Sequence, residues 1–404
     1  MGSKKGNVLI GVSASIAIYK SLEVISLLKK RGFNVRVAMT REASNFISPV
    51  VFEALTNSKV YIDVLEEFDN PDDTNITHIA LAKWADVFAI IPATSNIIAK
   101  IANGLSDDAV SLLALASEAK KLIAPAMNSS MYLNPITQEN IEKLKKYGFS
   151  IIEPVEGDLA CNTKGVGHIA DVCDMADAVE SLSSEKILSG KKVIVTAGPT
   201  VEAIDPVRFI TNKSSGKMGY AIAKAAVDFG ACVTLISGPS NLRKPFGVDF
   251  VNVNSALEML DELKKSIEKY GDCIVVMAAA VSDFKPKHYE KLKIKKHTTN
   301  DKLVLELIQN PDLTKEINKF AEEKGINLFT IGFAAETDNL LKNAGEKIKK
   351  KGLEFIVAND VSRNDIGFNT DENEVNIIYK DGSSESLPKM NKYDVACEIL
   401  RRIE

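Results

Sequence analysis

The stretch "DVFAIIPATSN" at residues 86–96 decides the fold class of this chain. It is apolar from Val87 to Ala93 and turns polar from Thr94 onward. A strand with one solvent-exposed face alternates apolar and polar residues, whereas a run that is apolar throughout suits a parallel strand buried on both faces. The stretch therefore predicts a parallel sheet covered by helices, with a polar loop at the carboxyl end of this strand.

Similar apolar runs recur along the chain and alternate with helix-length patterns. The first series is NVLIGVS (7–13), NVRVAMT (34–40), DVFAIIPAT (86–94) and KLIAPAMN (121–128). The second series is KKVIVTAGPT (191–200), CVTLISGP (232–239), CIVVMAAAVSDF (273–284), NLFTIGFAAE (327–336) and EFIVAND (354–360). Helices between parallel strands act as right-handed crossovers. The sequence thus predicts an α/β fold with two Rossmann-like three-layer domains and mainly parallel sheets. The polar segment 180–190 places their boundary at Gly190, giving domains 1–190 and 191–404.

The length and composition of the chain limit which classes of partner we expect it to bind. A length of 404 residues allows two or three domains, and the net charge of -4 shows no basic excess for nucleic acid. No apolar run reaches the roughly 18 to 20 residues needed to span a membrane. We therefore expect a cytoplasmic protein that binds small molecules, not nucleic acid or membranes.

The five cysteines are scattered without a CxxC pair, which fits a reducing compartment and makes a zinc site improbable. We expect Cys232, Cys273 and Cys397 to be buried as small hydrophobic residues. Cys161 differs because it lies in "LACNTKGVGH" (159–168), where two glycines, at 165 and 167, are expected to give a loop its freedom.

The first loop of the N-terminal half, GVSASIAIYK (11–20), follows a strand and opens a helix. Its backbone N–H groups and the Ser13 and Ser15 hydroxyls are candidates to hold a phosphate. The loop lacks GxGxxG, and the second strand ends at Thr40 where a dinucleotide enzyme has Asp or Glu. These features favour a mononucleotide such as FMN over NAD. The alternative is a helix N-cap without a ligand.

Two further loops follow neighbouring strands, PATSN (92–96) and PAMNSSMYLNP (125–135). Together they make a plausible pocket for a flat polar ring, although ordinary capping also explains them. His78, in "THIALAKWAD", is a candidate general base, the alternative being a structural histidine.

The motifs GVSASIAIYK, HIALAKWAD, PATSN and PAMNSSMY resemble the homo-oligomeric flavin-containing cysteine decarboxylases, and within them phosphopantothenoylcysteine decarboxylase, over residues 7–169. The resemblance implies His78 as catalytic base, Asn128 as the group that holds the substrate carboxylate, and Cys161 as the acid that protonates carbon. It departs at Asn162, Thr163 and His168, where the family has a glycine directly after the cysteine, an acidic residue at the next position and an arginine after the later glycines. The FMN contacts that it implies are Gly11, Ser13, Ser15, Thr40, Pro92, Ala93, Thr94, Ser95, Asn96 and Met127.

In the C-terminal half, residues 214–217 (SSGK) stand at the entry of a helix expected near Gly219. They do not match GxxxxGK[ST], but backbone amides and Lys217 are candidates to bind an anion. The basic run KLKIKK (291–296) suits phosphate oxygens, or is a solvated edge.

These pieces are similar to phosphopantothenate–cysteine ligase from residue 191 to the end, on the motifs RFITNKSSGKMG, AAAVSDF, KIKK, NPDL, GFAAET and AND. The resemblance implies CTP as the nucleotide, Asn212 steadying an acyl-cytidylate, and Lys293 with Mg²⁺ offsetting the phosphate charge; the ligands of the metal are unknown. The CTP contacts that it implies are Met277, Ala278, Ala279, Asp283, Lys293, Pro311, Asp312, Leu313, Thr314, Phe333, Lys347 and Lys351.

Taken together, the two resemblances imply a bifunctional enzyme of coenzyme A biosynthesis. Its expected substrates are 4'-phosphopantothenate, cysteine and CTP, with FMN and Mg²⁺ as cofactors. A homo-oligomer is expected, with a trimeric flavin domain, a dimeric ligase domain and up to a dodecamer. Two alternatives are a non-catalytic FMN-binding regulatory subunit and a generic NAD(P) oxidoreductase, which the missing glycine fingerprint opposes.

Overall fold

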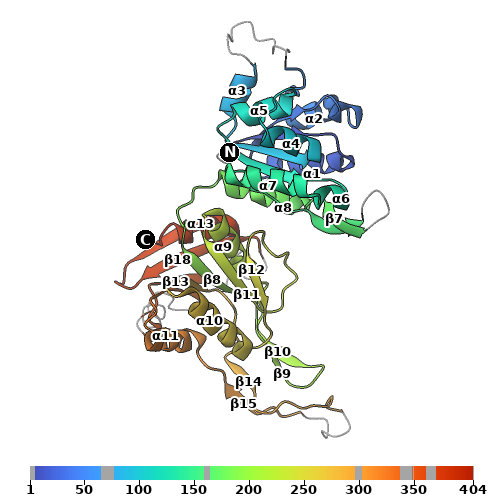
Figure 1. Cartoon of the computed structure of the whole chain (residues 1–404). Coiled ribbons are helices and arrows are strands. Elements are labelled where there is room, and N and C mark those ends of the chain that lie inside the picture. Colours follow the sequence, from blue (N-terminus) through green and yellow to red (C-terminus); the bar gives the residue numbers. More distant parts are fainter. Residues whose placement is uncertain are drawn as a thin grey trace. The chain divides into compact units, whose positions relative to one another are not determined.

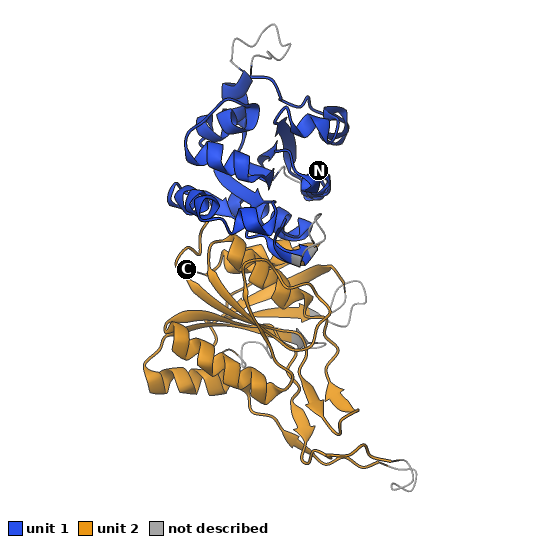
Figure 2. Cartoon of the chain, turned by 45° about the vertical axis from the view of Figure 1, so that its right-hand side comes forward, with its two compact units in different colours: residues 1–184 blue, residues 185–404 orange. Residues whose placement is uncertain are grey.

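A computed structural model describes residues 5–64, 77–158, 164–295, 303–336, 348, 350–360 and 370–403 (Figure 1). The chain divides into two compact units, residues 1–184 and 185–404 (Figure 2). Both are α/β units with mainly parallel sheets, so the predicted fold class is confirmed. No helix in the described part of the chain is long and apolar enough to cross a membrane.

The first unit is built on a five-stranded parallel sheet in the order β2-β1-β3-β4-β5. Its strands are β1 (Asn7–Val12), β2 (Asn34–Met39), β3 (Val87–Ala93), β4 (Lys120–Pro125) and β5 (Ser150–Ile151). Every residue of β3 is buried, as its apolar run predicted. The strand order reverses between β1 and β3, and open α/β sheets bind ligands at such a point.

Helices cover both faces of this sheet. The α-helices are α1 (Tyr19–Lys30), α2 (Pro49–Thr56), α3 (Thr77–Trp84), α4 (Ser95–Ala102), α5 (Ala109–Ala116), α6 (Ser129–Tyr132), α7 (Pro135–Lys146) and α8 (Val172–Ser183). Two 3-10 turns, η1 (Ile16–Ile18) and η2 (Ala43–Asn45), follow β1 and β2. A hairpin of β6 (Val155–Asp158) and β7 (Lys164–His168) lies outside the main sheet.

The second unit contains an eight-stranded sheet in the order β12-β11-β8-β13-β16-β17-β18-β19. Its strands are β8 (Lys192–Ala197), β11 (Cys232–Ser237), β12 (Asp249–Asn252), β13 (Cys273–Met277), β16 (Leu328–Glu336), β17 (Phe355–Asp360), β18 (Glu372–Tyr379) and β19 (Ser384–Asn391). Pairing is parallel from β12 to β17, and β18 and β19 close the edge as an antiparallel hairpin. The apolar runs of the sequence indicated β8, β11, β13, β16 and β17.

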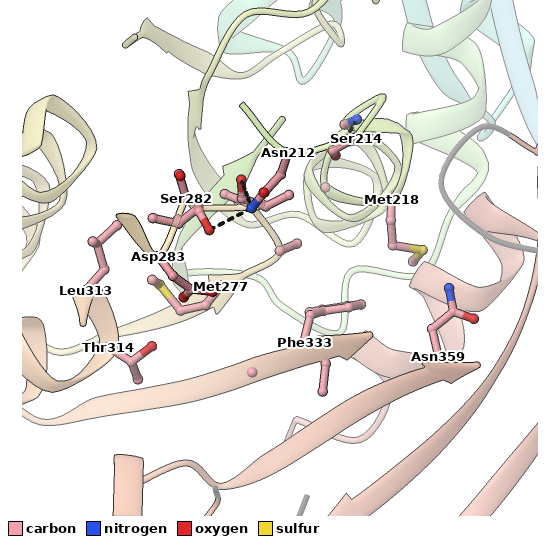
Figure 3. A pocket seen from close by; sticks show the side chains of 18 of the residues that line it. Asn212, Ser214, Met218, Met277, Ser282, Asp283, Leu313, Thr314, Phe333 and Asn359 are labelled. Carbon is pink, nitrogen blue, oxygen red and sulfur yellow. Dashed lines mark hydrogen bonds between the residues drawn. The ribbon is translucent and has the colours of Figure 1, made fainter. Parts of the chain in front are cut away.

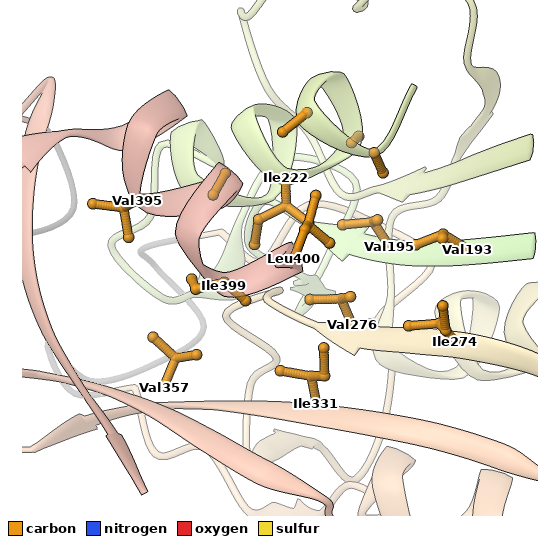
Figure 4. Packing of buried hydrophobic residues seen from close by; sticks show 14 of the residues in the cluster. Val193, Val195, Ile222, Ile274, Val276, Ile331, Val357, Val395, Ile399 and Leu400 are labelled. Carbon is orange, nitrogen blue, oxygen red and sulfur yellow. The ribbon is translucent and has the colours of Figure 1, made fainter. Parts of the chain in front are cut away.

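Adjacent residues of the central strands face opposite sides of the sheet and belong to different hydrophobic clusters. Val193 and Val195 of β8 pack with α9 (Lys217–Asp228) and α13 (Lys392–Leu400), as Figure 4 shows. Ile194 between them packs with α10 (Ala256–Tyr270) and α11 (Leu313–Lys324) on the other face. Burial on both faces explains the continuous apolar run and produces three layers.

Two small hairpins extend from this unit, β9 (Val201–Ala203) with β10 (Phe209–Thr211), and β14 (Phe284–Pro286) with β15 (Leu307–Gln309). Cys273 is buried and Cys397 half-buried, and burial raises the pKa of each thiol to about 11. The prediction was wrong for Cys232, which is exposed because it begins β11 at the end of that strand.

Candidate active sites

The loops after β1 and β3 are bound to each other at the point where the strand order reverses. The Ser13 hydroxyl donates to the carbonyl of Pro92 at 2.8 Å and accepts the N–H of Thr94 at 3.0 Å. Ser13 is 2% exposed, so this hydroxyl fixes the two loops rather than facing solvent. The bond holds the start of α4, whose N-cap is Thr94, beside the first loop.

The other predicted FMN residues occupy the same end of the sheet with different local roles. Ser15 is the N-cap of η1, and Thr40 is buried and accepts the N–H of Ala43 at 3.2 Å. At Gly11 a Cβ atom would lie 2.9 Å from Val110 Cγ1 and 3.0 Å from a ring carbon of Phe88. Gly11 is therefore required for packing within the core.

The third predicted loop contacts the β6–β7 hairpin. Asn128 is the N-cap of α6 and accepts the N–H of Ser130 at 2.8 Å, and Met127 donates its N–H to the carbonyl of Gly167 at 3.2 Å. A Cβ atom on Gly167 would lie 2.3 Å from the carbonyl oxygen of Met127, and one on Gly165 would lie 2.3 Å from Ser129 Oγ.

The prediction that these two glycines give a loop its freedom was wrong. They belong to β7 and let its backbone approach the Asn128 loop closely; Gly167 also has a φ of +140°. The hairpin therefore lies against that loop along β7, at Gly165 and Gly167, and its last strand pair joins Asp158 with Lys164. Cys161, Asn162 and Thr163 lie between these two residues and outside the described residues.

His78 and His168 come from different elements of the first unit. His78 is in α3, and its Nδ1 is buried without a hydrogen-bond partner in the described part of the chain. His168 ends β7, with its Nε2 3.1 Å from Nζ of Lys20 in α1. A buried side-chain nitrogen is usually hydrogen-bonded, so this atom of His78 would be satisfied by a group outside the described residues or by a ligand.

The second unit contains a cavity of about 600 Å³ at the carboxyl ends of β13 and β16 (Figure 3). In Figure 3, Met277, Asp283, Leu313 and Thr314 lie toward one end, Met218 and Asn359 toward the other, and Phe333 between them. The predicted residues that line this cavity are Asn212, Met277, Ala278, Ala279, Asp283, Pro311, Asp312, Leu313, Thr314, Phe333 and Lys351.

Hydrogen bonds from β8 and the loop after it shape the wall that runs from Ala278 to Ser282. Thr196 Oγ1 accepts the N–H of Ala279 at 3.2 Å, and Thr200 Oγ1 accepts the N–H of Ser282 at 2.9 Å. The Asn212 amide donates to the carbonyl of Val281 at 2.9 Å, which orients its side chain over the cavity. The wall is therefore preorganised by buried threonines.

A second part of the lining, next to Ser282, begins with α11. Asp312 is the N-cap of this helix, and its Oδ2 lies 3.0 Å from Nζ of Lys351. Asn310 is 6% exposed and donates to the carbonyl of Ser282 at 2.9 Å, but its Oδ1 has no partner in the described part of the chain. The buried Oδ1 of Asn359 likewise has no hydrogen-bond partner among the described residues. Bound N–H or O–H donors would satisfy both oxygens.

Comparisons with known proteins agree along the whole chain. The family model "DNA/pantothenate metabolism flavoprotein C-terminal domain" matches residues 188–404, and the model "Flavoprotein" matches residues 2–184. The coenzyme A biosynthesis bifunctional protein CoaBC of Bacillus subtilis is 45% identical, over 98% of this chain and 96% of its own length. The chain belongs to the CoaBC family.

Two solved structures are also similar to parts of this family member. A crystal structure of the C-terminal domain of a coenzyme A biosynthesis bifunctional protein CoaBC is 40% identical, covers 54% of this chain and 96% of that one, and has a TM-score of 0.45. The FMN-dependent cysteine decarboxylase SpaF is 30% identical, covers 45% of this chain and 99% of that one, and has a TM-score of 0.39.

Of the two remaining CoaBC ligase residues that were predicted, only Lys293 is described, and it is not brought to the cavity. Lys293 is exposed and does not line it, because the neighbouring backbone at Ile294 is bound to Asp205 and Arg208. Lys347 lies outside the described residues. In addition, α9 begins at Lys217 rather than near Gly219, because Gly216 adopts a φ of +77° as its N-cap.

Sequence reasoning missed Lys392, a buried lysine that lines the cavity. It is the first residue of α13, and burial, reinforced by Lys217 and opposed by Asp371, lowers its pKa to about 8. No motif marked it, since a lysine at the start of a terminal helix resembles an ordinary surface residue. In the described residues, no group of three or more His, Cys, Asp or Glu side chains is placed to hold a metal ion.

Proposed function

We propose that this CoaBC family member joins cysteine to 4'-phosphopantothenate in residues 191–404 and decarboxylates the product to 4'-phosphopantetheine in residues 1–190. The observation that carries the ligase assignment is the cavity that gathers Asn212 with the residues around Asp283, Leu313 and Phe333. For the decarboxylase, it is the contact between the Asn128 loop and the hairpin whose connecting residues include Cys161.

In the ligase reaction, a carboxylate oxygen of 4'-phosphopantothenate attacks the α-phosphorus of CTP, and pyrophosphate leaves. The acyl-cytidylate is then opened by the amine of cysteine, which forms the amide and releases CMP. Cations around the phosphates lower the barrier, and Mg²⁺ held largely by the nucleotide would add to them. The Asn212 amide, which donates to the carbonyl of Val281 and lines the cavity, would steady the acyl-cytidylate. Lys293 would be one of the cations near the phosphates after a movement of its exposed segment toward the cavity.

In the decarboxylase reaction, FMN would be held at the β1/β3 reversal by the loops that Ser13 joins and by the start of α4. When bound, FMN supplies reversible two-electron oxidation of the thiol end of the substrate, which makes loss of CO₂ feasible. His78, whose Nδ1 has no partner among the described residues, would take a proton, and the Asn128 side chain would bind the substrate carboxylate. Cys161 would then donate a proton to carbon.

We infer a homo-oligomer, with trimers of the flavin unit, dimers of the ligase unit and a dodecamer as the largest assembly. Exposed apolar side chains support association: Ile136 of α7 is 70% exposed, and Leu292 and Val304, near β14 and β15, are 81% and 89% exposed. The measurement is the molar mass of the full chain by light scattering.

The test of the site assignment is the variant Cys161→Ser, with exposed Cys232→Ser as its matched control. Cys161→Ser should keep its flavin absorbance and its CTP-dependent ligation, and should accumulate an oxidised, decarboxylated product detectable by mass. Cys232→Ser should turn over like the unmodified chain. Full turnover by Cys161→Ser would remove this thiol from the mechanism, and a colourless protein would exclude the flavin.

A further inference from the structure

We propose that Asn310 is a positioning residue for the nucleotide, because it joins two segments of the cavity lining that are expected to contact CTP. Asn310 is 6% exposed and lines the cavity. The CTP contacts implied for this stretch begin only at the next residue, Pro311, so they assign Asn310 no role. The inference rests on the proposed ligase function and adds a residue to it.

Asn310 donates two hydrogen bonds to successive carbonyl groups of the segment that follows β13. Its backbone N–H donates to the carbonyl of Asp283 at 2.8 Å, and its side-chain Nδ2 donates to the carbonyl of Ser282 at 2.9 Å. The bond to Ser282 is buried, so water cannot replace it when the donor is removed. Two bonds from one residue restrain both the position and the orientation of the segment that carries Asp283.

The local sequence prepares Asn310 for this contact. It stands between the end of β15, at Gln309, and Pro311, and a residue before proline is disfavoured in the helical conformation. Helix α11 therefore begins after Pro311, with Asp312 as its N-cap. Asn310 thus connects the carbonyl groups after β13 to the start of a helix that also lines the cavity.

The carbonyl before Ser282 is bound by the other asparagine of the site. The Asn212 amide donates to the carbonyl of Val281 at 2.9 Å. Three successive carbonyl groups, those of residues 281–283, are therefore bound by two asparagines that lie far apart in the sequence. Because both asparagines bind one short segment, loss of the Asn310 bond would disturb the alignment between Asn212 and the nucleotide contacts.

The size of the effect depends on the fraction of molecules in which the lining is correctly formed. Removing the Nδ2 donor leaves a buried carbonyl without this hydrogen bond, a loss that corresponds to about a tenfold change in an equilibrium. When only a fraction of the molecules is competent to bind, the apparent Kd rises in inverse proportion to that fraction. The Kd for CTP should therefore rise about tenfold when the donor is lost.

The experiment measures the binding of CTP with Mg²⁺ to the full chain by titration calorimetry at pH 8. Asn310→Asp and Asn310→Leu both lack the donor at this pH, since a carboxylate only accepts hydrogen bonds. Both should bind CTP about tenfold more weakly than the unmodified chain. Tyr270→Phe is the matched control, because it removes a partly buried hydrogen bond to Thr234 in the same unit and neither residue lines the cavity.

A pH series separates the hydrogen bond from a loss of packing. A protonated aspartic acid has nearly the shape of asparagine and carries an O–H that can donate to the carbonyl of Ser282. Burial and the carboxylates of Asp283 and Asp312 would raise the pKa of the introduced carboxyl, and Lys351, which is paired with Asp312, would oppose them. As the pH falls from 8 to 5, Asn310→Asp should regain CTP affinity relative to the unmodified chain at the same pH. Asn310→Leu should not.

The outcomes distinguish this inference from the function on which it rests. Unchanged CTP affinity in both Asn310 variants would overturn the inference alone, and so would equal losses that persist at pH 5. Thr200→Val leaves Asn310 intact and removes the other bond to Ser282, so it applies the test even to a chain that the Asn310 substitutions unfold. It should also weaken CTP binding, and an unchanged Kd would contradict the inference. Absence of CTP binding by the unmodified chain would overturn the proposed ligase function as well.

Discussion

The substitution Gly167→Ala should separate the two activities of the chain. The new Cβ atom would stand 2.3 Å from the carbonyl oxygen of Met127, which belongs to the backbone and cannot rotate away. Gly167 also has a φ of +140°, a conformation that residues with a side chain rarely adopt. Strand β7 must therefore leave the Asn128 loop to accommodate the methyl group.

The magnitude follows from two contributions. The backbone conformation costs about 1–3 kcal/mol for a residue other than glycine. Lifting the strand also loses the hydrogen bond from Met127 to Gly167, about 1 kcal/mol. A total of about 3 kcal/mol would reduce the population of seated hairpin by about a hundredfold, because each 1.4 kcal/mol is a factor of ten. The decarboxylation rate should fall by that factor.

The assay measures CO₂ release from phosphopantothenoylcysteine and CTP-dependent pyrophosphate release on the same preparation. Ligation should be unchanged, since Gly167 belongs to the first unit. Gly148→Ala is the matched control, because Gly148 has a φ of +84° with no atom within 4 Å of a new Cβ. Decarboxylation by Gly167→Ala within twofold of the Gly148→Ala rate would refute the reasoning, as would an equal fall in ligation.

Three further variants test the stability of each unit. Ser13→Ala should leave the N–H of Thr94 unpaired and remove one of the two hydrogen bonds to the carbonyl of Pro92, which should destabilise the first unit by about 1–3 kcal/mol, seen as a lower melting transition and faster loss of flavin. Ile399→Ala removes a fully buried side chain between α13 and the sheet and should destabilise the second unit by about 2–5 kcal/mol in urea unfolding. Hydrogen bonds from Arg402 and Tyr379 lower the pKa of Glu385 to about 2. Because the folded pKa is depressed, this carboxylate stabilises the fold above its ordinary pKa, and the stabilisation disappears as the pH falls toward 2. Glu385→Gln should thus cost at most about 1 kcal/mol at pH 7, since the pair is partly solvated, and the difference should vanish in acid.

The sequence predicted those parts of the fold in which burial leaves a recognisable pattern of apolar residues along the chain. The central strands β3, β8 and β13 are buried on both faces, so their apolar runs are continuous. The edge hairpin of β18 and β19 leaves no such run: several residues of each strand are exposed or half-buried.

The site was predicted where chemistry is carried by short motifs, and missed where it depends on packing. The segments around Asn212 and Asp283 meet at one cavity because the carboxyl ends of parallel strands share one edge of a sheet. Lys392 could not be found in this way, since its burial is set by distant residues. Gly167 shows the same limit: sequence identifies a glycine, but only the neighbouring backbone shows that close approach, not mobility, requires it.

The central claim is that one chain performs ligation and then decarboxylation. The most direct measurement is the mass of the product formed by the purified full chain from 4'-phosphopantothenate, cysteine, CTP and Mg²⁺. The account predicts 4'-phosphopantetheine, with one CO₂, one CMP and one pyrophosphate for each molecule formed. Recovery of unchanged 4'-phosphopantothenate, with either CTP or ATP present, would contradict it.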